Sequence, residues 1–357
     1  MSRTQTIPSS LHFTGVTEAT KYGQGEYRSA CVKCGGDSNS DRFILLEVSK
    51  ITGGPFAFCR KCGYKTSLKS TDKWVVLSEE ERAKFAAERL RREKEDVAKI
   101  EVNREHFRKV PWWETYNHAL QHYPHAVELW RSRYGINNWA LEYYKLGYCK
   151  DFGYMHNGEK YVSETLTIPI FEPGTNYKII NMRHRLLSPE AKGGRYRPAK
   201  AGLGQSLFFA NLGQRMKIEE RREPGNPIAA NKVDYKIMVV VEGAIKAISI
   251  WQSVMSEFME GIASPETIWF HANVQVIGIP GTNLHKRNEP LLESANRIYL
   301  VLDPDAVEDR KDEQLAEQLG TNRTRSIYLP GKPDDLIISG TLNIKNIVML
   351  MKQSRRF

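Results

Sequence analysis

The sequence predicts a multidomain α+β protein, on the basis of three observations. Four cysteines form two CxxC pairs within the first 75 residues, a long charged stretch follows, and beyond residue 233 apolar strand-like runs alternate with helical ones. Such alternation predicts a parallel sheet covered by helices on both faces. We therefore expect a small β domain, a charged linker helix, a basic α+β subdomain and an α/β domain, in that order.

Composition and length set the expected boundaries. A chain of 357 residues is long enough for two or three domains. Residues 78–107 are rich in Glu, Arg, Lys and Ala, which is typical of a solvated helix between domains. A polar break with Pro and Gly at 220–232 marks a second boundary. The predicted parts are a β domain at 1–75, a linker at 76–110, a basic subdomain at 111–232, an α/β domain at 233–340 and a tail at 341–357.

The charge of the chain predicts an anionic partner. The net charge is +10 and the estimated pI is 9.2, a balance that favours nucleic acid. No apolar run reaches the roughly 18 residues that a membrane span needs, and the N-terminus lacks the apolar segment of a signal peptide. We expect a cytoplasmic protein without a membrane partner.

The two cysteine pairs, CVKCGG and CRKCGY, are near repeats. Two such knuckles can supply four thiolates to one structural zinc ion, and the 24 residues between the pairs have room for a β-hairpin. We therefore predict a zinc ribbon, with redox-active or unpaired cysteines as the alternative. Basic and aromatic residues around it suit single-stranded nucleic acid, although the aromatics could simply fill a small core. The predicted zinc ligands are Cys31, Cys34, Cys59 and Cys62.

A pair of acids, Asp303 and Asp305, ends the apolar run RIYLVLDPDA. If the chain stays extended, residues two apart point to the same side, and Pro304 favours that conformation for its predecessor. Two like charges a few Å apart repel by about 1 kcal/mol in water and about 4 kcal/mol near a protein surface. Oxygen ligands of this kind suit Mg²⁺ or Mn²⁺, and a divalent cation would remove the repulsion.

Further acids occupy equivalent places. Glu242 ends the strand-like run VVVEG, and Asp334 and Asp335 follow the run RSIYLPG. In an open α/β sheet, ligands bind beyond the carboxyl ends of the strands. Taken singly, a solvated turn, a loop acid or a helix cap explains each of these acids equally well. Their convergence on one edge of the sheet favours a metal site.

The motifs VVVEG, YLVLDPD and PDD resemble the Toprim domain. That resemblance implies that Glu242, Asp303 and Asp305 hold Mg²⁺ or Mn²⁺ for phosphoryl-transfer chemistry, with Asp334 or Asp335 as a further catalytic acid. The Toprim domain is shared by DnaG-type primases, topoisomerases and some nucleases. The chain departs at Lys246 from the Toprim domains of bacterial primases, which usually have an acid there, one helical turn after the glutamate. The lysine could contact a phosphate directly, or one metal could be held more weakly.

Almost all of the charge in the region 167–212 is positive. Alternation in KIINMRHRLL would place Arg183 and Arg185 on one face of a strand. A groove lined in this way could hold a template backbone or a nucleoside triphosphate, and a solvated charged face is the alternative. The candidate nucleotide- or template-binding residues are Lys178, Arg183, Arg185, Arg195, Arg197, Lys200 and Lys246.

The order of these parts, together with LGY, TIPIF, MRHRLL and GGRYRPA, resembles DnaG-type DNA primases, and the four-cysteine ribbon resembles the phage form. The resemblance implies synthesis of short RNA primers on single-stranded DNA from ribonucleoside triphosphates. No GxxxxGK[ST] motif is present, so the expected replicative helicase is a separate partner, and a single-strand-binding protein is a further candidate. A Toprim-type nuclease and a non-catalytic, RecR-like DNA-binding protein remain as alternatives.

Overall fold

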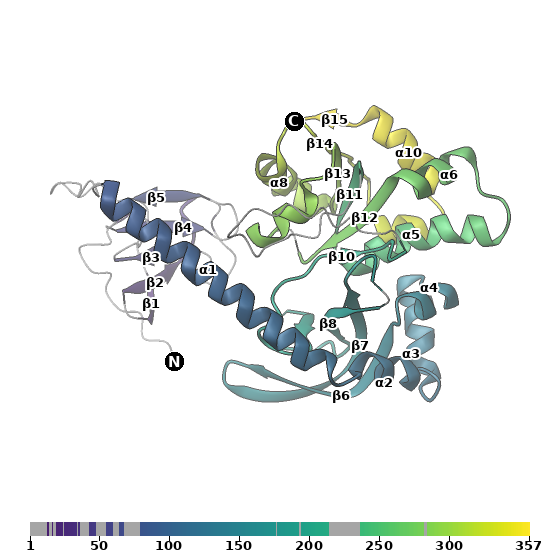
Figure 1. The fold of residues 1–357 in the computed structure, drawn as a ribbon, viewed down its shortest axis with the longest axis horizontal. Coiled ribbons are helices and arrows are strands. Elements are labelled where there is room, and N and C mark those ends of the chain that lie inside the picture. Colours follow the sequence, from purple (N-terminus) through teal and green to yellow (C-terminus); the bar gives the residue numbers. More distant parts are fainter. Residues whose placement is uncertain are drawn as a thin grey trace, which may run out of the picture. The chain divides into compact units, whose positions relative to one another are not determined.

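The computed structural model forms two compact units, Met1–Arg92 and Glu93–Phe357. It has a mixed α+β architecture with three separate sheets (Figure 1). No helix among the described residues is both long and apolar enough to cross a membrane. The structure describes residues 13, 16, 19–23, 25–33, 35, 43–47, 55–59, 64–67, 79–175, 177–192, 194–213, 236–281 and 284–357.

The first unit contains a five-stranded antiparallel sheet. The hairpin predicted between the cysteine pairs is present, because β3 and β4 pair with Phe43 opposite Cys59. Alternate residues face a small core, in which Phe43, Leu45 and Ala57 are fully buried. The strands, in spatial order, are β1 (Thr20–Gly23), β2 (Glu26–Ser29), β3 (Phe43–Leu46), β4 (Phe56–Cys59) and β5 (Lys65–Ser67).

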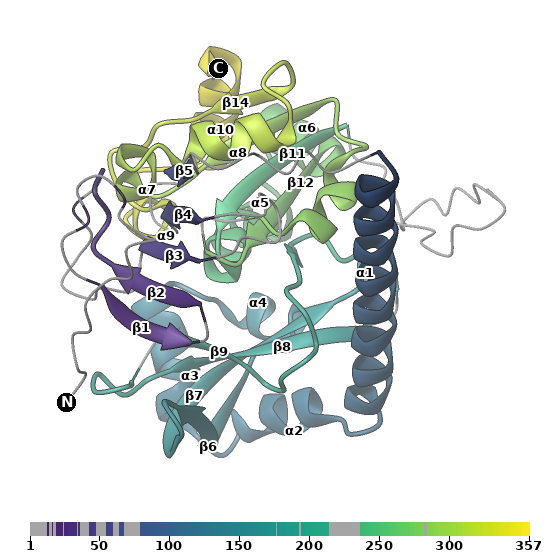
Figure 2. The same ribbon diagram turned by 90° about the vertical axis from the view of Figure 1, so that its left-hand side faces the viewer.

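The long helix α1 (Glu79–Arg108) has two different parts. Residues 90–99 are exposed, as expected of a charged linker. In the last turns, Phe107 is buried, Arg104 donates to the carbonyl of Leu203 and Arg108 donates to that of Ile179. Figure 2 shows this end of α1 against the sheet that contains β8. The last turns of the helix are therefore part of the second unit rather than a solvated spacer.

The region predicted as a basic subdomain contains a four-stranded antiparallel sheet. In its third strand, Arg183 and Arg185 are half-buried on one face, and His184 is buried on the other. This alternation is the one expected from the sequence. The strands are β6 (Gly147–His156), β7 (Glu159–Phe171), β8 (Ile179–Leu186) and β9 (Tyr196–Pro198), preceded by α2 (Trp112–Ala119), α3 (Pro124–Glu128), η2 (Leu129–Arg133) and α4 (Asn138–Tyr143).

The third sheet has four parallel strands at its centre, as predicted, and one antiparallel strand at each edge. In spatial order the strands are β10 (Phe208–Phe209), β12 (Val274–Ile279), β11 (Ile237–Glu242), β13 (Arg297–Val301), β14 (Thr324–Ser326) and β15 (Arg355–Arg356). The surrounding helices are α5 (Ala244–Met259), α6 (Pro265–Asn273), η3 (Lys286–Leu292), α7 (Pro304–Glu308), α8 (Lys311–Leu319), α9 (Pro333–Ile338) and α10 (Ile344–Gln353).

Two elements of this sheet fall outside the expected α/β region. Strand β10 comes from the stretch predicted as basic subdomain, and β15 comes from the predicted tail. Helix α10, also in the predicted tail, buries Ile344, Ile347 and Met351. These segments belong to the domain because β10 and β15 pair with its two edge strands and α10 buries apolar residues against it. The two added strands cover sheet edges that would otherwise expose unpaired backbone groups.

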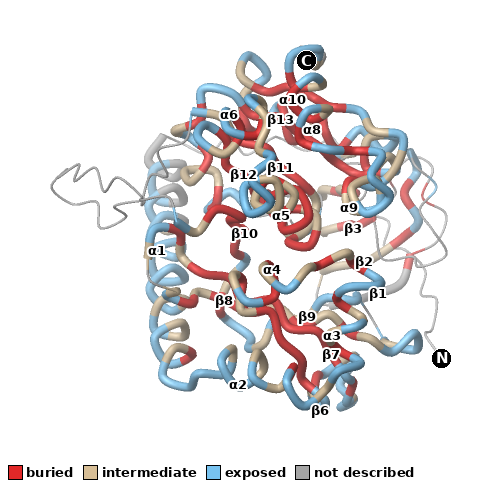
Figure 3. Tube along the Cα trace, turned by 90° about the vertical axis from the view of Figure 1, so that its right-hand side faces the viewer, coloured by how far each residue is buried: buried red, intermediate tan, exposed pale blue. Residues whose placement is uncertain are grey.

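Each parallel strand buries both faces. Val239 and Val241 of β11 pack in one cluster with α5, α6 and α10, whereas Met238 and Val240 pack in a second cluster with α8. Figure 3 shows the buried strands between these helices. Burying an aliphatic side chain of this size stabilises the fold by about 1.5–3 kcal/mol, so both layers hold the sheet in place.

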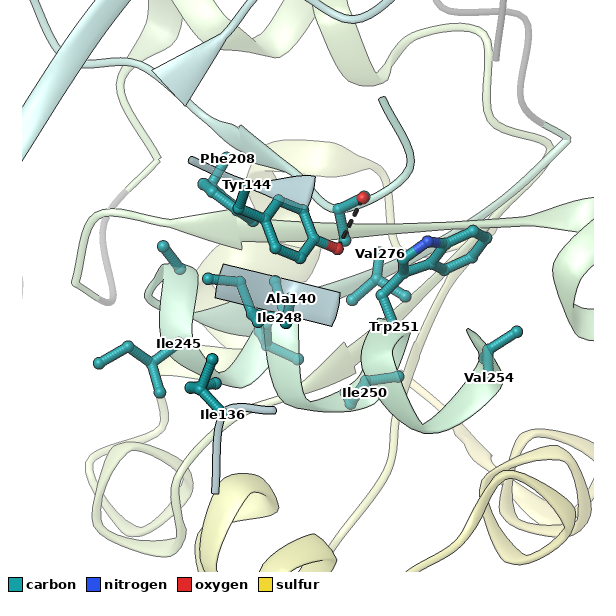
Figure 4. Close-up of a cluster of buried hydrophobic side chains, with 14 of the residues drawn as sticks. Ile136, Ala140, Tyr144, Phe208, Ile245, Ile248, Ile250, Trp251, Val254 and Val276 are labelled. Carbon is teal, nitrogen blue, oxygen red and sulfur yellow. Dashed lines mark hydrogen bonds between the residues drawn. The ribbon is translucent and has the colours of Figure 1, made fainter. Parts of the chain in front are cut away.

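The antiparallel region and the parallel sheet share one core. Tyr144, which follows α4, donates a hydrogen bond of 2.8 Å to the carbonyl of Ala210 and packs beside Phe208. Figure 4 shows Tyr144 and Phe208 next to Ile248 and Trp251 of α5. This shared core fixes the strands that carry the arginines relative to the strand ends that carry the acids.

Candidate functional site

Glu242 is the last residue of β11 and lies where the order of the parallel strands reverses. The turn after it depends on two glycines. Gly243 has a φ of 86°, and a Cβ on Gly278 would lie 2.5 Å from the Gly243 carbonyl oxygen. The Gly243 N–H donates to the carbonyl of Ile279 at 2.8 Å. Strand β12 therefore approaches the turn after β11 so closely that residue 278 has no room for a side chain. This contact fixes the position of Glu242.

Asp303 and Asp305 do not lie in one extended segment, which was the condition for expecting their side chains on the same side. Asp303 is extended and 5% exposed, but the chain becomes helical at Pro304, the first residue of α7. Asp305 therefore lies in the first helical turn and is exposed. Only the expected extended backbone at residue 305 is wrong, because proline restricts its predecessor and at the same time suits the first position of a helix.

The second pair of acids also has one member that is more buried than the other. Asp334 and Asp335 both lie in the first turn of α9. Asp334 is half-buried and lines a cavity beyond the strand ends, whereas Asp335 is exposed.

That cavity has a volume of about 820 Å³ and lies entirely within the second unit. Three of the predicted acids reach it, and Asp305 and Asp335 are not among its lining residues. Lys178 is also absent from the lining, and its ammonium lies 2.7 Å from Glu172 instead. The predicted residues that line the cavity are Glu242, Asp303 and Asp334, with Arg183, Arg185, Arg195, Arg197, Lys200 and Lys246.

Two lysines contact the acids. The Lys246 ammonium lies 3.1 Å from Asp303 Oδ2, and that of Lys332 lies 3.9 Å from the same oxygen. Burial nevertheless raises the pKa of Asp303, and Lys246 offsets only part of this effect. Burial also raises the pKa of Glu242, and the charges of Asp303 and Asp305 add to the rise. The lysines therefore leave part of the electrostatic cost of these carboxylates uncompensated.

Two carboxylate oxygens of the cavity have no donor among the described residues. Asp303 Oδ1 and Asp334 Oδ1 are buried and accept no hydrogen bond from the described residues. Among those residues, no three His, Cys, Asp or Glu side chains are close enough together to hold a metal ion. Buried carboxylate oxygens without donors are costly, and a hard divalent cation is their usual partner. Asp303 and Asp334 thus supply oxygens of the kind that Mg²⁺ or Mn²⁺ binds.

The arginines of the cavity are held by tyrosines. The Arg185 guanidinium lies 4.7 Å from the Tyr134 ring centre and 5.0 Å from that of Tyr196, and it donates to both hydroxyls. Arg183 donates to the Ser206 carbonyl at 2.7 Å, and burial lowers its pKa to about 10, so it remains charged at neutral pH. These contacts hold Arg183 and Arg185 in place inside the cavity. The alternative considered from the sequence was a charged face in which the arginines are free in solvent.

Arg197 retains an unused donor. Its guanidinium lies 5.2 Å from the Tyr154 ring centre, and its Nη2 donates to the carbonyl of Lys192 at 2.7 Å. Its Nε is buried and has no acceptor among the described residues. A buried guanidinium N–H without an acceptor favours an anionic ligand.

Three lining residues were missed by the sequence argument. Lys332 stands two positions before Asp334 in GKPDD, so its place after the fourth strand could have identified it. Tyr196 lies inside the GGRYRPA motif and was not singled out. Tyr134 comes from a helical segment far from the other residues in sequence, and no local pattern indicates its contact with Arg185.

The cysteine pairs are described only in part. Cys31 and Cys59 are buried, and the strand register Ser29–Phe43–Cys59 places both at one end of the sheet. The backbone N–H of Lys33 donates to Cys31 Sγ at 3.4 Å, a contact that stabilises a thiolate. Cys34 and Cys62 lie outside the described residues.

No family model and no curated protein matches the chain. Among solved structures, the Aquifex aeolicus primase, comprising zinc-binding and RNA polymerase domains, is 18% identical with a TM-score of 0.47, over 95% of this chain and 81% of that one. A DnaG primase catalytic domain bound to single-stranded DNA is 13% identical with a TM-score of 0.47, over 74% and 83%.

A bacteriophage T7 structure is also similar. In it, the lagging-strand DNA polymerase interacts with two primase domains bound to an RNA/DNA hybrid; the identity is 14% and the TM-score 0.39, over 63% of this chain and 91% of that one. All three are structures of primases or contain primase domains.

Proposed function

We propose that this protein is a DNA primase that joins ribonucleotides into short primers on single-stranded DNA. One observation carries the proposal. A single cavity brings two buried carboxylate oxygens without donors, on Asp303 and Asp334, together with fixed arginines. Acids that accept a divalent cation, next to cations that accept phosphate, are the arrangement that nucleotidyl transfer needs.

Asp303, Asp334 and Glu242 would hold Mg²⁺ or Mn²⁺. The cation would neutralise charge on the transferring phosphoryl group. The carboxylates are suited to this because burial has already removed them from water, which strengthens their attraction for a cation. Asp305 and Asp335, exposed at the start of their helices, would act at longer range through their charge.

The cations of the cavity would bind the phosphates. Arg183 and Arg185 are fixed by Ser206, Tyr134 and Tyr196, so little side-chain entropy is lost when a triphosphate or template backbone binds. Lys246 would release Asp303 to the metal and move its ammonium to a phosphate. Lys200 and Arg195 would extend the same surface.

The β domain would recognise the template. Cys31, Cys34, Cys59 and Cys62 would bind one structural zinc ion, because two CxxC pairs supply a complete tetrahedral ligand set. A separate replicative helicase and a single-strand-binding protein would be its partners at the replication fork. Zinc analysis should find about one ion per chain, and Cys59→Ser should lose it; retention of zinc by that variant would exclude the ribbon.

A primer-synthesis assay tests the enzymatic proposal. Labelled ribonucleotides should enter short products on single-stranded DNA in the presence of Mg²⁺ or Mn²⁺. Cleavage of the strand without synthesis would support the nuclease instead. Binding with neither reaction would support the RecR-like alternative.

A further inference from the structure

A second cavity lies at the opposite end of the parallel sheet. It has a volume of about 850 Å³ and is lined by residues at the beginnings of β11 and β13, on β14, and on α6 and α10. Ile237, at the start of β11, lines it, whereas Glu242, at the end of the same strand, lines the first cavity. Five residue steps of a strand span about 17 Å, so the two cavities are separate.

The floor of this cavity is formed by two buried side chains. Tyr299 and Arg325 are register partners on β13 and β14, and each is 5% exposed. Partners in register stand on the same face of a sheet, here the face covered by α6 and α10. Val348 and Met351 of α10 form an apolar wall beside them. The floor thus combines an aromatic ring with a guanidinium.

The rim adds charge and an indole. Lys236, Arg297 and Lys352 line it and are exposed, against one acid, Glu266. Trp269 of α6 is 39% exposed, and its ring makes no aromatic or cation–π contact with any other described residue. Figure 1 shows α6 beside α10. An indole left open next to cations is a platform on which a base can stack while its phosphate is bound.

We propose that this cavity is a second nucleotide-binding site, in which a base stacks on Trp269 and a phosphate is bound by Arg297 and Lys352. The ligand is either a free nucleotide or one nucleotide unit of a single strand, since both present a flat ring and a phosphate. The site goes beyond the proposed synthesis of primers and uses none of the residues of the first cavity. A solvated polar surface does not account for the combination of a large cavity, a buried arginine and an open indole.

The test is fluorine NMR on the full-length protein labelled with fluorotryptophan, without divalent metal. The Trp269 resonance is assigned by its loss in Trp269→Phe. It should shift saturably on titration with ATP, with oligothymidylate, or with both, and which probe acts identifies the source of the ligand. The resonance of Trp112, which is exposed but stacked on Tyr116, should stay in place and serves as the internal control.

Charge variants complete the test. Arg297→Glu with Lys352→Glu should weaken the binding reported by Trp269 about tenfold or more. It should also reduce the salt dependence of strand binding by about 0.7 in log–log slope, the contribution of one phosphate contact on a single strand. Lys345→Glu, an exposed residue of α10 outside both cavities, is the matched control. If the double variant fails to fold, Arg297→Gln with Lys352→Gln replaces it.

A Trp269 resonance that responds to neither probe overturns the proposal, as does equal binding by the double variant and by Lys345→Glu. Failure of the catalytic proposal is distinguishable, because it would appear as absent primer synthesis while the Trp269 response remained.

Discussion

The acids and the cations that line the first cavity are positioned in different ways. Glu242 and Asp303 are short side chains at the ends of neighbouring parallel strands, so the backbone alone places them. Arg183 and Arg185 are long side chains on an antiparallel strand, and Ser206, Tyr134 and Tyr196 hold them. The comparison shows that short functional groups depend on strand ends, whereas long ones depend on tertiary neighbours.

The largest effect is expected at the acid edge. Asp303→Asn keeps the shape of the side chain but removes the charge from a buried oxygen that has no donor. Primer synthesis should fall by about 10²- to 10³-fold, the scale for losing a group that stabilises charge in the transition state. Steady-state incorporation of ribonucleotides measures it. Asp305→Asn, on the exposed first turn of α7, is the matched control and should change the rate only a few-fold. Equal effects of the two substitutions would show that burial does not distinguish them.

The next effect is expected at the clamped arginine. Arg185→Ala removes a fixed cation and should raise the KM for ribonucleotides or template by about ten- to a hundredfold, the equivalent of about 1.5–3 kcal/mol for hydrogen bonds to a charged group. Lys178→Ala, outside the cavity and paired with Glu172, should change KM less than about twofold, as an exposed ion pair contributes little. A large effect of Lys178→Ala would mean that the ligand extends beyond the cavity.

Glycine at 278 should be required by the turn that holds Glu242. A Cβ at this position would lie 2.5 Å from the Gly243 carbonyl oxygen, so Gly278→Ala must displace backbone. Denaturant unfolding should show a loss of about 1–3 kcal/mol, the usual cost of overpacking. Gly194→Ala, where an added Cβ meets nothing within 4 Å, should be close to neutral. Unchanged stability of Gly278→Ala would contradict the close approach of β12 to this turn.

A smaller, pH-dependent effect is expected on the buried face of β8. Burial lowers the pKa of His184 to about 3, and its Nδ1 lies 2.9 Å from Thr165 Oγ1. Below its ordinary pKa near 6.5, the unfolded chain binds a proton that the folded protein does not, so stability falls as the pH falls. Between pH 7 and pH 5 the loss attributable to His184 should be about 2 kcal/mol. Unfolding of His184→Gln at both pH values measures it, and an unchanged pH dependence would contradict the assigned burial effect.

Much of the parallel sheet could be predicted from the sequence, because strands buried on both faces must be continuously apolar. The runs ending at Glu242 and Asp303 were located in this way, and the sheet pairs them as neighbours. The helical backbone at the second acid of each pair could not be predicted. Asp305 and Asp335 each lie in the first turn of a helix that begins at a proline. The spacing of the acids in the sequence does not indicate that a helix begins there.

The sequence by itself determined which acids end the parallel strands and which strand face carries Arg183 and Arg185, since side-chain direction alternates along any strand. Only the tertiary structure decided that Lys246 and Lys332 approach Asp303, that Tyr134 holds Arg185, and that Lys178 stays outside the cavity. The physical reason is the length of the side chain. The carboxylate of Asp or Glu lies within a few bonds of the backbone, so the backbone largely sets its position, whereas the residues packed around a lysine or arginine determine where its charged group lies.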